Sequence, residues 1–299
     1  MSRHLGLDLG GTNIKWVVLE RHGDVWEAVD RGHVPTPEGG PEVVTDALIS
    51  AGRGALAACP GLETVGLGVP GLYYPESGDT RFLVNIEGEW DRFPVGSMIS
   101  DGLGLPTHLV NDARAFGLAE LRLGAGRGAT SMIGWTLGTG VGGVIAIDGR
   151  VVQGHDGTAG EMGHQTIDPA GPPCNCGNNG CVEAFVRADR IALACQSDTV
   201  EEAVERARGG DAVCLAGLAE TGRYLGIGVA NMVTVLAPDR VVIGGGVAAA
   251  LDLMLPTLRA ELHRRVHTTD LDRVEIVPAE LGTWAGGIGA AVHGAETAA

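Results

Sequence analysis

Alternating apolar and polar positions divide the first part of the chain into short strands joined by glycine turns. Residues 4–20, HLGLDLGGTNIKWVVLE, predict a strand, a glycine-rich turn and a second strand, and a turn at 21–24 leads to a third strand, VWEAVDRGHV. A helix is expected from about Pro41, followed by the strand TVGLGVPG at 64–71. The first part therefore predicts an α/β unit that begins with antiparallel hairpins.

The same order of elements recurs after the middle of the chain. Residues 131–154, SMIGWTLGTGVGGVIAIDGRVVQG, again predict a strand, a glycine-rich turn, a strand and a hairpin. Long helices and the strand RVVIGGGVA at 240–248 follow, and the apolar helical stretch 212–237 suits either a core or an interface. Two parts that each open with a hairpin across a glycine turn indicate an internal duplication.

Composition and charge narrow the class of protein. The 299 residues, 44% of them hydrophobic, are enough to fill the cores of two ordinary domains. The chain opens MSRHLGLDLGG, with no apolar stretch long enough for export or for crossing a membrane. A formal net charge of −16 without a basic stripe argues against nucleic acid as a partner. We expect a cytoplasmic protein that binds neither nucleic acid nor a membrane.

Glycine turns that join one strand to the next are candidates for binding phosphate. The runs are Gly10, Gly11 and Thr12; Gly138, Thr139 and Gly140; and Gly244, Gly245 and Gly246. Backbone N–H groups reach phosphate oxygens only where side chains are absent, and each threonine adds a hydroxyl donor. In Rossmann and P-loop sites the glycine turn leads into a helix, so this arrangement differs from both. The alternative is that these are ordinary β-turns.

Asp8 stands directly before the first turn, in the pattern DxGGTxxK that ends at Lys15. A carboxylate is a hard oxygen ligand of the kind Mg²⁺ prefers. Beside a phosphate-binding turn it indicates a site for a magnesium nucleotide. The alternative is a strand-end aspartate that only caps the turn.

A second carboxylate lies where a strand meets a helix. In THLVNDARAFGLAELRLGAG the strand is expected to end at Val110, so Asn111 and Asp112 occupy the junction. A carboxylate at such a junction points into the crevice at the carboxyl ends of the strands. Asp112 could equally be the helix N-cap, which is the commonest role of Asp or Asn at that place.

A group of metal-ligand residues falls within 161–183, EMGHQTIDPAGPPCNCGNNGCVE. The candidate ligands are His164, Cys174, Cys176 and Cys181. Thiolate and imidazole ligands in tight Gly/Pro turns suit tetrahedral Zn²⁺, and four protein ligands leave no open position, so we predict a structural zinc. The alternatives are buried core thiols, like those expected at Cys59, Cys195 and Cys214, or a disulfide, which a cytoplasmic location disfavours.

Two carboxylates flank the predicted metal ligands. Glu161 precedes His164 by three residues, and Glu183 follows Cys181 by two. Folding around the metal is therefore expected to bring both carboxylates close to His164. Such a pair is suited to holding the hydroxyls of a sugar.

Together these segments resemble the ROK family (repressor, open reading frame, kinase) over almost the whole chain. The motifs DLGGTNIK, VPG, VNDARAF, TLGTGVGG, EMGH, CNCGNNGCVE and VIGGGVA occur in the order and spacing of that family. The resemblance implies an α/β, actin-like, hexokinase-type (RNase H-like) ATPase fold with a cleft between two lobes. The expected lobes are 1–122, completed by a C-terminal helix at 285–299, and 123–284 with the zinc loop. A homodimer or homotetramer is implied as well.

The activity that the resemblance implies is ATP-dependent phosphorylation of a hexose at its 6-hydroxyl. Most kinases of the family resemble glucokinases, so glucose is the expected substrate. Fructose, N-acetylglucosamine and N-acetylmannosamine remain alternatives, as does a sugar-binding member without catalysis. A repressor of the family would carry a helix-turn-helix domain before the phosphate loop, and this loop starts at residue 8, which argues against that role.

The family pattern also implies a role for individual residues. Asp112 would be the general base. The sugar-binding positions would be Gly71, Asn85, Asn111, Asp112, Glu161, His164 and Glu183. The positions for ATP and its Mg²⁺ would be Asp8, Gly10, Gly11, Thr12, Asn13, Lys15, Gly138, Thr139, Gly140, Gly244, Gly245 and Gly246. Because His164 would bind zinc with one ring nitrogen and face the sugar with the other, zinc removal is expected to weaken hexose binding more than ATP binding.

Overall fold

The computed structural model describes residues 1–298 and divides the chain into two compact units. The first unit comprises Met1–Gly124, Gln153–Ala159 and Leu281–Ala299, and the second comprises Ala125–Val152 and Gly160–Glu280. Nothing in the sequence pattern indicated that the short segment Gln153–Ala159 packs with the first unit.

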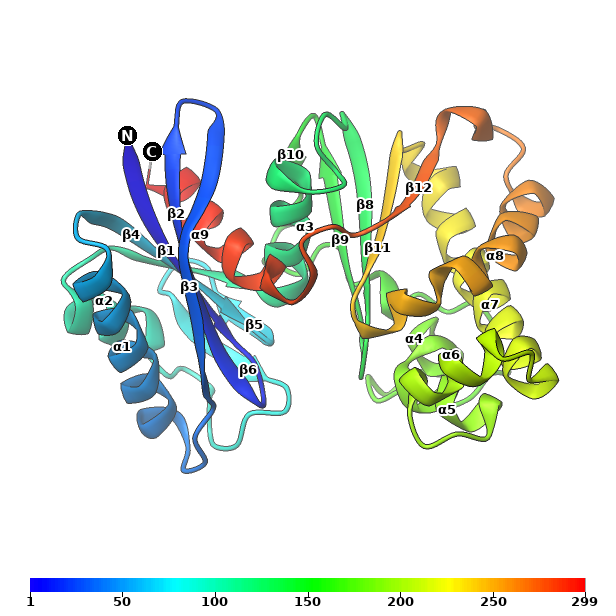
Figure 1. Cartoon of the computed structure of the whole chain (residues 1–299), viewed down its shortest axis with the longest axis horizontal. Helices are drawn as coiled ribbons and strands as arrows, with labels where there is room; N and C mark the ends of the chain where they lie inside the picture. Colours follow the sequence, from blue (N-terminus) through cyan, green and yellow to red (C-terminus); the bar gives the residue numbers. More distant parts are fainter. Residues whose placement is uncertain (299) are drawn as a thin grey trace. The chain divides into compact units, whose positions relative to one another are not determined.

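The first unit is built on a five-stranded sheet with the order β3-β2-β1-β4-β7 (Figure 1). Its strands are β1 (Ser2–Leu9), β2 (Asn13–His22), β3 (Val25–Pro35), β4 (Leu62–Val69) and β7 (Thr107–Asn111). The hairpins β1–β2 and β2–β3 are antiparallel, whereas β4 and β7 run parallel to β1. A small hairpin of β5 (Gly71–Tyr74) and β6 (Asp79–Leu83) and the helices α1 (Pro41–Ala58), α2 (Val95–Leu103), α3 (Asp112–Leu123) and α9 (Ala285–Thr297) complete it. The predicted hairpins and the helix from Pro41 are confirmed.

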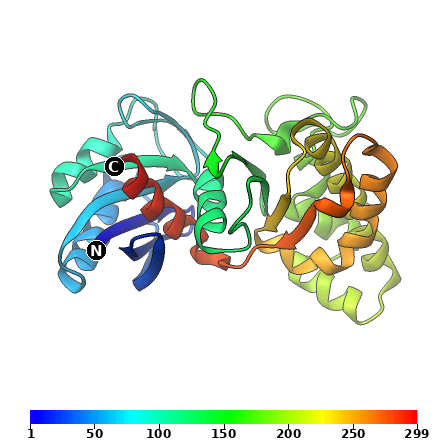
Figure 2. The same cartoon turned by 90° about the horizontal axis from the view of Figure 1, so that it is seen from above.

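Alternation along β1 sends its side chains to two different layers. Leu7 is buried in the same apolar cluster as Leu48 of α1. Gly6 and Asp8 face the opposite side, where the C-terminal helix α9, red in Figure 2, lies against the strands. A Cβ atom on Gly6 would lie 1.8 Å from the carbonyl oxygen of Gly287, so glycine permits this close approach. The packing brings the first turn of α9 next to Asp8.

The second unit repeats the topology of the first sheet. Its strands are β8 (Ser131–Leu137), β9 (Val141–Ile147), β10 (Arg150–Val151), β11 (Arg240–Gly244) and β12 (Glu275–Pro278), in the order β10-β9-β8-β11-β12. As in the first sheet, two antiparallel hairpins precede two parallel strands. The predicted duplication is therefore confirmed at the level of topology.

Helices of the second unit pack against this sheet and around the glycine and cysteine loops. They are α4 (Glu183–Val186), α5 (Ala188–Cys195), α6 (Val200–Arg208), α7 (Ala212–Leu236) and α8 (Leu251–Arg265). Short 3-10 turns are η1 (Met162–His164), η2 (Gly246–Ala250) and η3 (Leu271–Arg273), and η4 (Gly282–Trp284) belongs to the first unit. The short helix α4 matters most for function, because it directly follows the cysteine loop.

The long helix α7 is a core helix of its unit. Gly228 lies against the buried Trp135 of β8, and a Cβ atom on this glycine would be 3.3 Å from the indole ring. Val213 and Val235, near the two ends of α7, are exposed. The interface role that the sequence left open for this helix stays a prediction. Within residues 1–298, no helix has both the length and the apolar character that crossing a bilayer requires.

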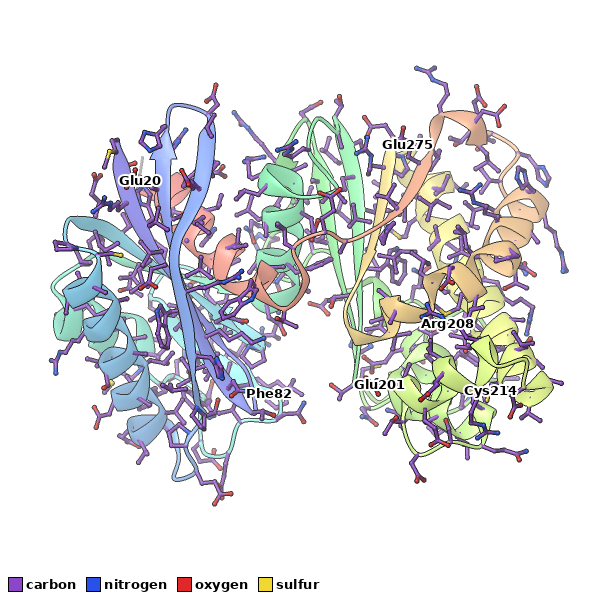
Figure 3. All side chains as sticks on the ribbon, viewed as in Figure 1. Glu20, Phe82, Glu201, Arg208, Cys214 and Glu275 are labelled. Atoms are coloured by element: carbon purple, nitrogen blue, oxygen red, sulfur yellow. The ribbon has the colours of Figure 1, made fainter. Side chains whose placement is uncertain are left out.

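Two buried thiols outside the cysteine loop are core residues, as predicted. Figure 3 labels Cys214, which lies at the beginning of α7. Its Sγ is 3.5 Å from the carbonyl oxygen of Cys195, and the Sγ of Cys195 is 3.8 Å from the carbonyl oxygen of Cys214. Both side chains are fully buried between α5 and α7, so they serve packing.

Candidate functional site

The first glycine turn is held by Thr36, which follows β3. The hydroxyl of Thr36 donates to the carbonyl of Gly10 over 2.6 Å, and its N–H donates to the carbonyl of Thr12 over 2.9 Å. Because C=O and N–H point in opposite directions across a trans peptide, the N–H of Gly11 is directed away from Thr36. Thr36 therefore holds the turn without using the N–H of Gly11.

Thr36 was missed by the sequence analysis. It stands between two prolines at the point where the third predicted strand ends, in VPTP. When three consecutive strands pair antiparallel, the end of the third strand lies beside the turn between the first two. A hydrogen-bond donor directly after the third predicted strand is therefore the sequence signal that indicates Thr36.

Asp8 is half-buried beside the beginning of α9. A Cβ atom on Gly286 would lie 2.5 Å from Asp8 Oδ2, so only glycine fits between the helix and this carboxylate. Burial raises the pKa of the Asp8 carboxyl, and the nearby Lys15 opposes that effect. A divalent cation at the carboxylate would likewise favour its charged form, so the residue fits a metal-ligand role.

Lys15 has a partner within the protein. It stands opposite Asp8 in the β1–β2 hairpin, and its Nζ donates to the carbonyl of Thr283 over 2.9 Å. Its predicted contact with a nucleotide stays a prediction, whereas the bond to Thr283 ties the hairpin to the turn that precedes α9.

Asp8 and Asp112 lie at the same edge of the first sheet. Asp8 pairs with Gly68 of β4, and Gly68 pairs with Val110 of β7. Neighbouring strands are about 4.8 Å apart, so the backbones at Asp8 and Val110 are roughly 10 Å apart. The carboxyl ends of parallel strands are where α/β sheets bind ligands.

Asn111 caps the helix that follows β7. Its Oδ1 accepts hydrogen bonds from the N–H groups of Ala113 and Arg114 over 3.1 and 3.2 Å. Its Nδ2 donates to the carbonyl of Gly71 over 3.1 Å. The alternative that Asp112 is the N-cap is therefore wrong, because Asn111 has that role and Asp112 is the first residue of α3.

The carboxylate of Asp112 is exposed but oriented. Its Oδ1 accepts from Asn111 Nδ2 over 3.0 Å and from the N–H of Ala113 over 2.8 Å. A carboxylate with a fixed direction at a strand end is suited to accept a proton from a bound hydroxyl.

Two further positions predicted to contact sugar, Gly71 and Asn85, lie beside other predicted site residues. Gly71 has a φ of 151°, and a Cβ atom there would be 2.1 Å from the carbonyl oxygen of Phe82. Asn85 has a φ of 60°, and its carbonyl oxygen would be 2.9 Å from a Cβ atom on Gly11. The structure thus brings Gly71 to Asn111 and Asn85 to the first glycine turn.

The second glycine turn connects β8 to β9. The N–H of Gly138 donates to the carbonyl of Gly140 over 2.9 Å, and the carbonyl of Gly138 accepts from the N–H of Ala188 over 2.8 Å. A Cβ atom on Gly138 would meet nothing within 4 Å, and Thr139 is exposed. The outer side of this turn is therefore open to a ligand.

The third glycine run packs next to the second turn. Gly244 pairs with Thr136 in the parallel ladder. Gly245 has a φ of 86°, and a Cβ atom there would lie 2.2 Å from the carbonyl oxygen of Leu137. Gly246 has open space around it. Glycine is required at Gly245 by close packing, while Gly138 and Gly246 border unfilled space.

The four predicted metal ligands converge. Their ligand atoms all lie within 4.8 Å of one another, with 3.6 Å from Cys174 Sγ to His164 Nδ1 and 3.7 Å from Cys176 Sγ to Cys181 Sγ. A tetrahedral zinc with Zn–S bonds of about 2.3 Å separates its sulfur ligands by about 3.8 Å. The spacing fits zinc, and none of the six cysteines forms a disulfide.

Local bonds prepare the cysteine loop for a metal. The N–H of Cys174 donates to the carbonyl of Asn178 over 2.8 Å, and Gly177, with a φ of 90°, makes the turn between them. Burial raises the pKa of Cys174 to about 12. Its thiolate is therefore favoured only beside a cation, which a bound zinc would supply.

The two carboxylates near the cluster differ in their surroundings. Glu161 is exposed, and its carbonyl accepts from the N–H of His164 over 3.1 Å. Glu183 is only 9% exposed. Its Oε2 accepts from the N–H of Val141 over 2.9 Å, and its Oε1 lies 3.5 Å from Cys174 Sγ. Glu183 therefore connects the cysteine loop to the second glycine turn, a contact that the sequence analysis did not anticipate.

Solved structures of the same fold include sugar kinases. A ROK hexokinase from Thermus thermophilus superposes with a TM-score of 0.88 and 35% identity, covering 99% of both chains. A ROK family glucokinase from Streptomyces griseus, in complex with glucose and AMPPNP, superposes with a TM-score of 0.82 at 30% identity, covering 99% of this chain and 100% of that one. These matches confirm the predicted fold class, an α/β, actin-like sugar kinase fold with two lobes.

Sequence relatives carry two kinds of name. A glucokinase from Halalkalibacterium halodurans is 35% identical over 96% of this chain and 93% of its own length. A putative xylose repressor from Caldicellulosiruptor is 30% identical over 93% of this chain and 74% of its own length. The model of the ROK family matches residues 4–295. The chain therefore belongs to the ROK family.

Proposed function

We propose that this protein is an ATP-dependent hexose kinase that transfers the γ-phosphoryl group to the 6-hydroxyl of glucose. The observation that carries the proposal is Asp112, an exposed carboxylate oriented by Asn111 and the N–H of Ala113. It lies on the same sheet edge as Asp8 and the first glycine turn. The relatives named glucokinase favour glucose among the hexoses.

Asp112 would act as the general base. A sugar hydroxyl is too weak an acid to lose its proton before the reaction begins, but a carboxylate accepts that proton as the bond to phosphorus forms. Direction and reach therefore matter more than basicity, and Asn111 supplies the direction. Gly71, Asn85 and Asn111 would bind the sugar.

Further residues would bind the remaining groups of both substrates. The sugar-binding residues proposed here are Glu161, His164 and Glu183. The turn at Gly138–Gly140 and the run at Gly244–Gly246 would contact ATP with backbone N–H groups, together with the first glycine turn. Phosphoryl transfer depends chiefly on alignment and charge stabilisation, which backbone donors provide.

Two metal ions would accompany the reaction. Mg²⁺ beside Asp8 would neutralise charge on the phosphates of ATP. The cluster of His164 and the three cysteines of the loop would hold a structural Zn²⁺, with Nδ1 as the ligand nitrogen of His164. That arrangement leaves Nε2 of the ring for a sugar hydroxyl.

A coupled assay of ADP release tests the proposal. Glucose, fructose, mannose, N-acetylglucosamine and N-acetylmannosamine would be compared at equal concentrations with ATP and Mg²⁺. We expect the highest kcat/KM with glucose. Faster turnover of another hexose would reassign the substrate. Sugar binding without ADP release from any of them would contradict the kinase function and leave a sugar-binding protein.

A further inference from the structure

Val141, the first residue of β9, is held from two sides by the segments that carry the metal ligands. Its N–H donates to Glu183 Oε2 over 2.9 Å. On its other side, a Cβ atom on Gly163 would lie 2.1 Å from the carbonyl oxygen of Val141. Gly163 directly precedes the ligand His164, and Glu183 follows the ligand Cys181 by two residues. Val141 itself is buried, 4% exposed.

The segment 183–188 contacts both ends of the second glycine turn. At one end Glu183 accepts from Val141, and at the other the N–H of Ala188 donates to the carbonyl of Gly138 over 2.8 Å. Between these two contacts lies the single turn of α4. This short segment therefore holds the turn Gly138–Gly140 at both ends.

Gly140 shows how closely Glu183 fits against the turn. A Cβ atom on Gly140 would lie 2.9 Å from Glu183 Oε2, so the carboxylate fills the space that a side chain would occupy. On its other side the carboxylate lies 3.5 Å from Cys174 Sγ. Glu183 therefore spans the distance between a metal ligand and the backbone of the turn.

We propose that Glu183 is a positioning residue through which the Cys/His metal centre fixes the nucleotide-binding turn Gly138–Gly140. The proposal rests on the kinase function proposed above and assigns the metal centre a second task besides sugar binding. Binding of zinc orders the cysteine loop, the loop orders segment 183–188, and that segment sets the direction of the N–H groups of the turn. The positioning role adds an effect on nucleotide binding to the effect on hexose binding that is expected from zinc removal.

The test measures nucleotide binding without sugar, so that contacts to the sugar contribute nothing. Titration calorimetry with AMPPNP and Mg²⁺ would compare the zinc-loaded wild type, the chelator-treated wild type, Glu183→Ala and Glu183→Gln. Loss of the acceptor leaves the buried Val141 N–H unsatisfied, and we expect the Kd for AMPPNP to rise about tenfold in Glu183→Ala and in the zinc-depleted protein. In Glu183→Gln the amide oxygen still accepts from Val141, so Kd should stay within about threefold.

Glu275→Gln is the matched control in the same unit. Glu275 lies on β12, and it pairs with Arg240 over 2.8 Å at the beginning of β11, at the opposite end of that strand from Gly244 (Figure 3). The Kd of the Glu275→Gln variant for AMPPNP should equal that of the wild type. Zinc content by elemental analysis would accompany every titration.

The outcomes separate the two proposals. Wild-type protein that binds no nucleotide contradicts the kinase function itself. Wild-type affinity for AMPPNP in both Glu183→Ala and the chelator-treated protein overturns only the positioning role and returns the metal centre to the sugar alone. Chelation needs no substitution. The titration of the chelator-treated wild type therefore tests the positioning role even if Glu183→Ala does not fold.

Discussion

Asn111 donates from Nδ2 to Oδ1 of Asp112 over 3.0 Å, while its own Oδ1 caps the helix that Asp112 begins. One residue thus ends the strand, starts the helix and directs the carboxylate. The helix is capped one position before Asp112, so its beginning does not require the charge of Asp112. Stability and catalysis are therefore separable at this junction.

The first prediction follows from that separation. Asp112→Asn should lower kcat by roughly a hundredfold to ten thousandfold while sugar Kd and melting temperature change little. Steady-state kinetics, sugar titration and a thermal scan measure the three quantities. Asp101→Asn on the exposed side of α2 is the control, with kcat unchanged. A variant at position 112 that keeps more than about a tenth of the wild-type kcat places the base elsewhere.

Asn111→Ala, unlike Asp112→Asn, should lower the stability of the protein. Loss of an N-cap costs about 1 kcal/mol, and the half-buried carbonyl of Gly71 loses its donor as well. Denaturant unfolding should show a loss of about 1–3 kcal/mol. An equal stability loss in Asp112→Asn would mean that the capping assignment is wrong.

Local patterns were enough to predict the hairpins, the glycine turns and the repeat. Each depends on alternation or on residues adjacent in sequence, such as Gly10 and Gly11 between two strands. The contact of Glu183 with Val141 spans 42 residues, and the bond from Lys15 to Thr283 spans 268. Such contacts follow from packing between elements, and no periodicity in the sequence encodes them.

The convergence of His164, Cys174, Cys176 and Cys181 could be predicted for a different reason. These residue types are rare and close together, and the loop between Cys174 and Cys181 closes on itself. Burial of the flanking carboxylates could not be predicted in the same way. Both Glu161 and Glu183 lie within three residues of a predicted metal ligand. Glu161 is nevertheless exposed, whereas Glu183 is packed against Gly140.

A glycine in α9 provides a test of the Asp8 site. A Cβ atom on Gly286 would lie 2.5 Å from Asp8 Oδ2, so Gly286→Ala should displace the carboxylate. We expect a higher Mg²⁺ concentration for half-maximal activity and a lower kcat, with sugar affinity unchanged, as in Asp8→Ala. The Mg²⁺ dependence of ADP release measures this. A matching loss of sugar affinity would argue against separate nucleotide and sugar roles.

Gly54→Ala is the matched control for that substitution. Gly54 lies inside α1, and a Cβ atom there meets nothing within 4 Å. The change should leave the Mg²⁺ dependence unaltered and stabilise the protein by about 0.5–1 kcal/mol, because alanine is the better helix former.

His293 on α9 should make the protein sensitive to acid. Burial, with a smaller contribution from His108, lowers the pKa of His293 to about 4. Below the unfolded pKa of about 6.5 the unfolded chain binds a proton that the folded chain does not, so stability is lost as pH falls from 6.5 towards 4. The loss between pH 7.5 and pH 5 should be about 2 kcal/mol.

Urea unfolding at those two pH values tests the histidine. His293→Gln should reduce the difference in unfolding free energy between them by about 2 kcal/mol. His267→Gln, on an exposed position, should leave the difference unchanged. An unaltered pH dependence in His293→Gln would show that the ring titrates normally in the folded state.

The last prediction concerns the zinc. Cys176→Ala leaves three ligands, and a three-ligand site binds zinc weakly, so metal content should fall well below one per chain. The loop between Cys174 and Cys181 then loses its cross-link, and the melting temperature should drop by about 5 °C or more. The KM for sugar should rise because His164 loses its orientation. Cys59→Ala, outside the cluster, should keep its zinc and its KM. The zinc site would be contradicted if purified wild-type protein contains no zinc and its KM for sugar is the same before and after dialysis against zinc. These cysteines would then serve only packing.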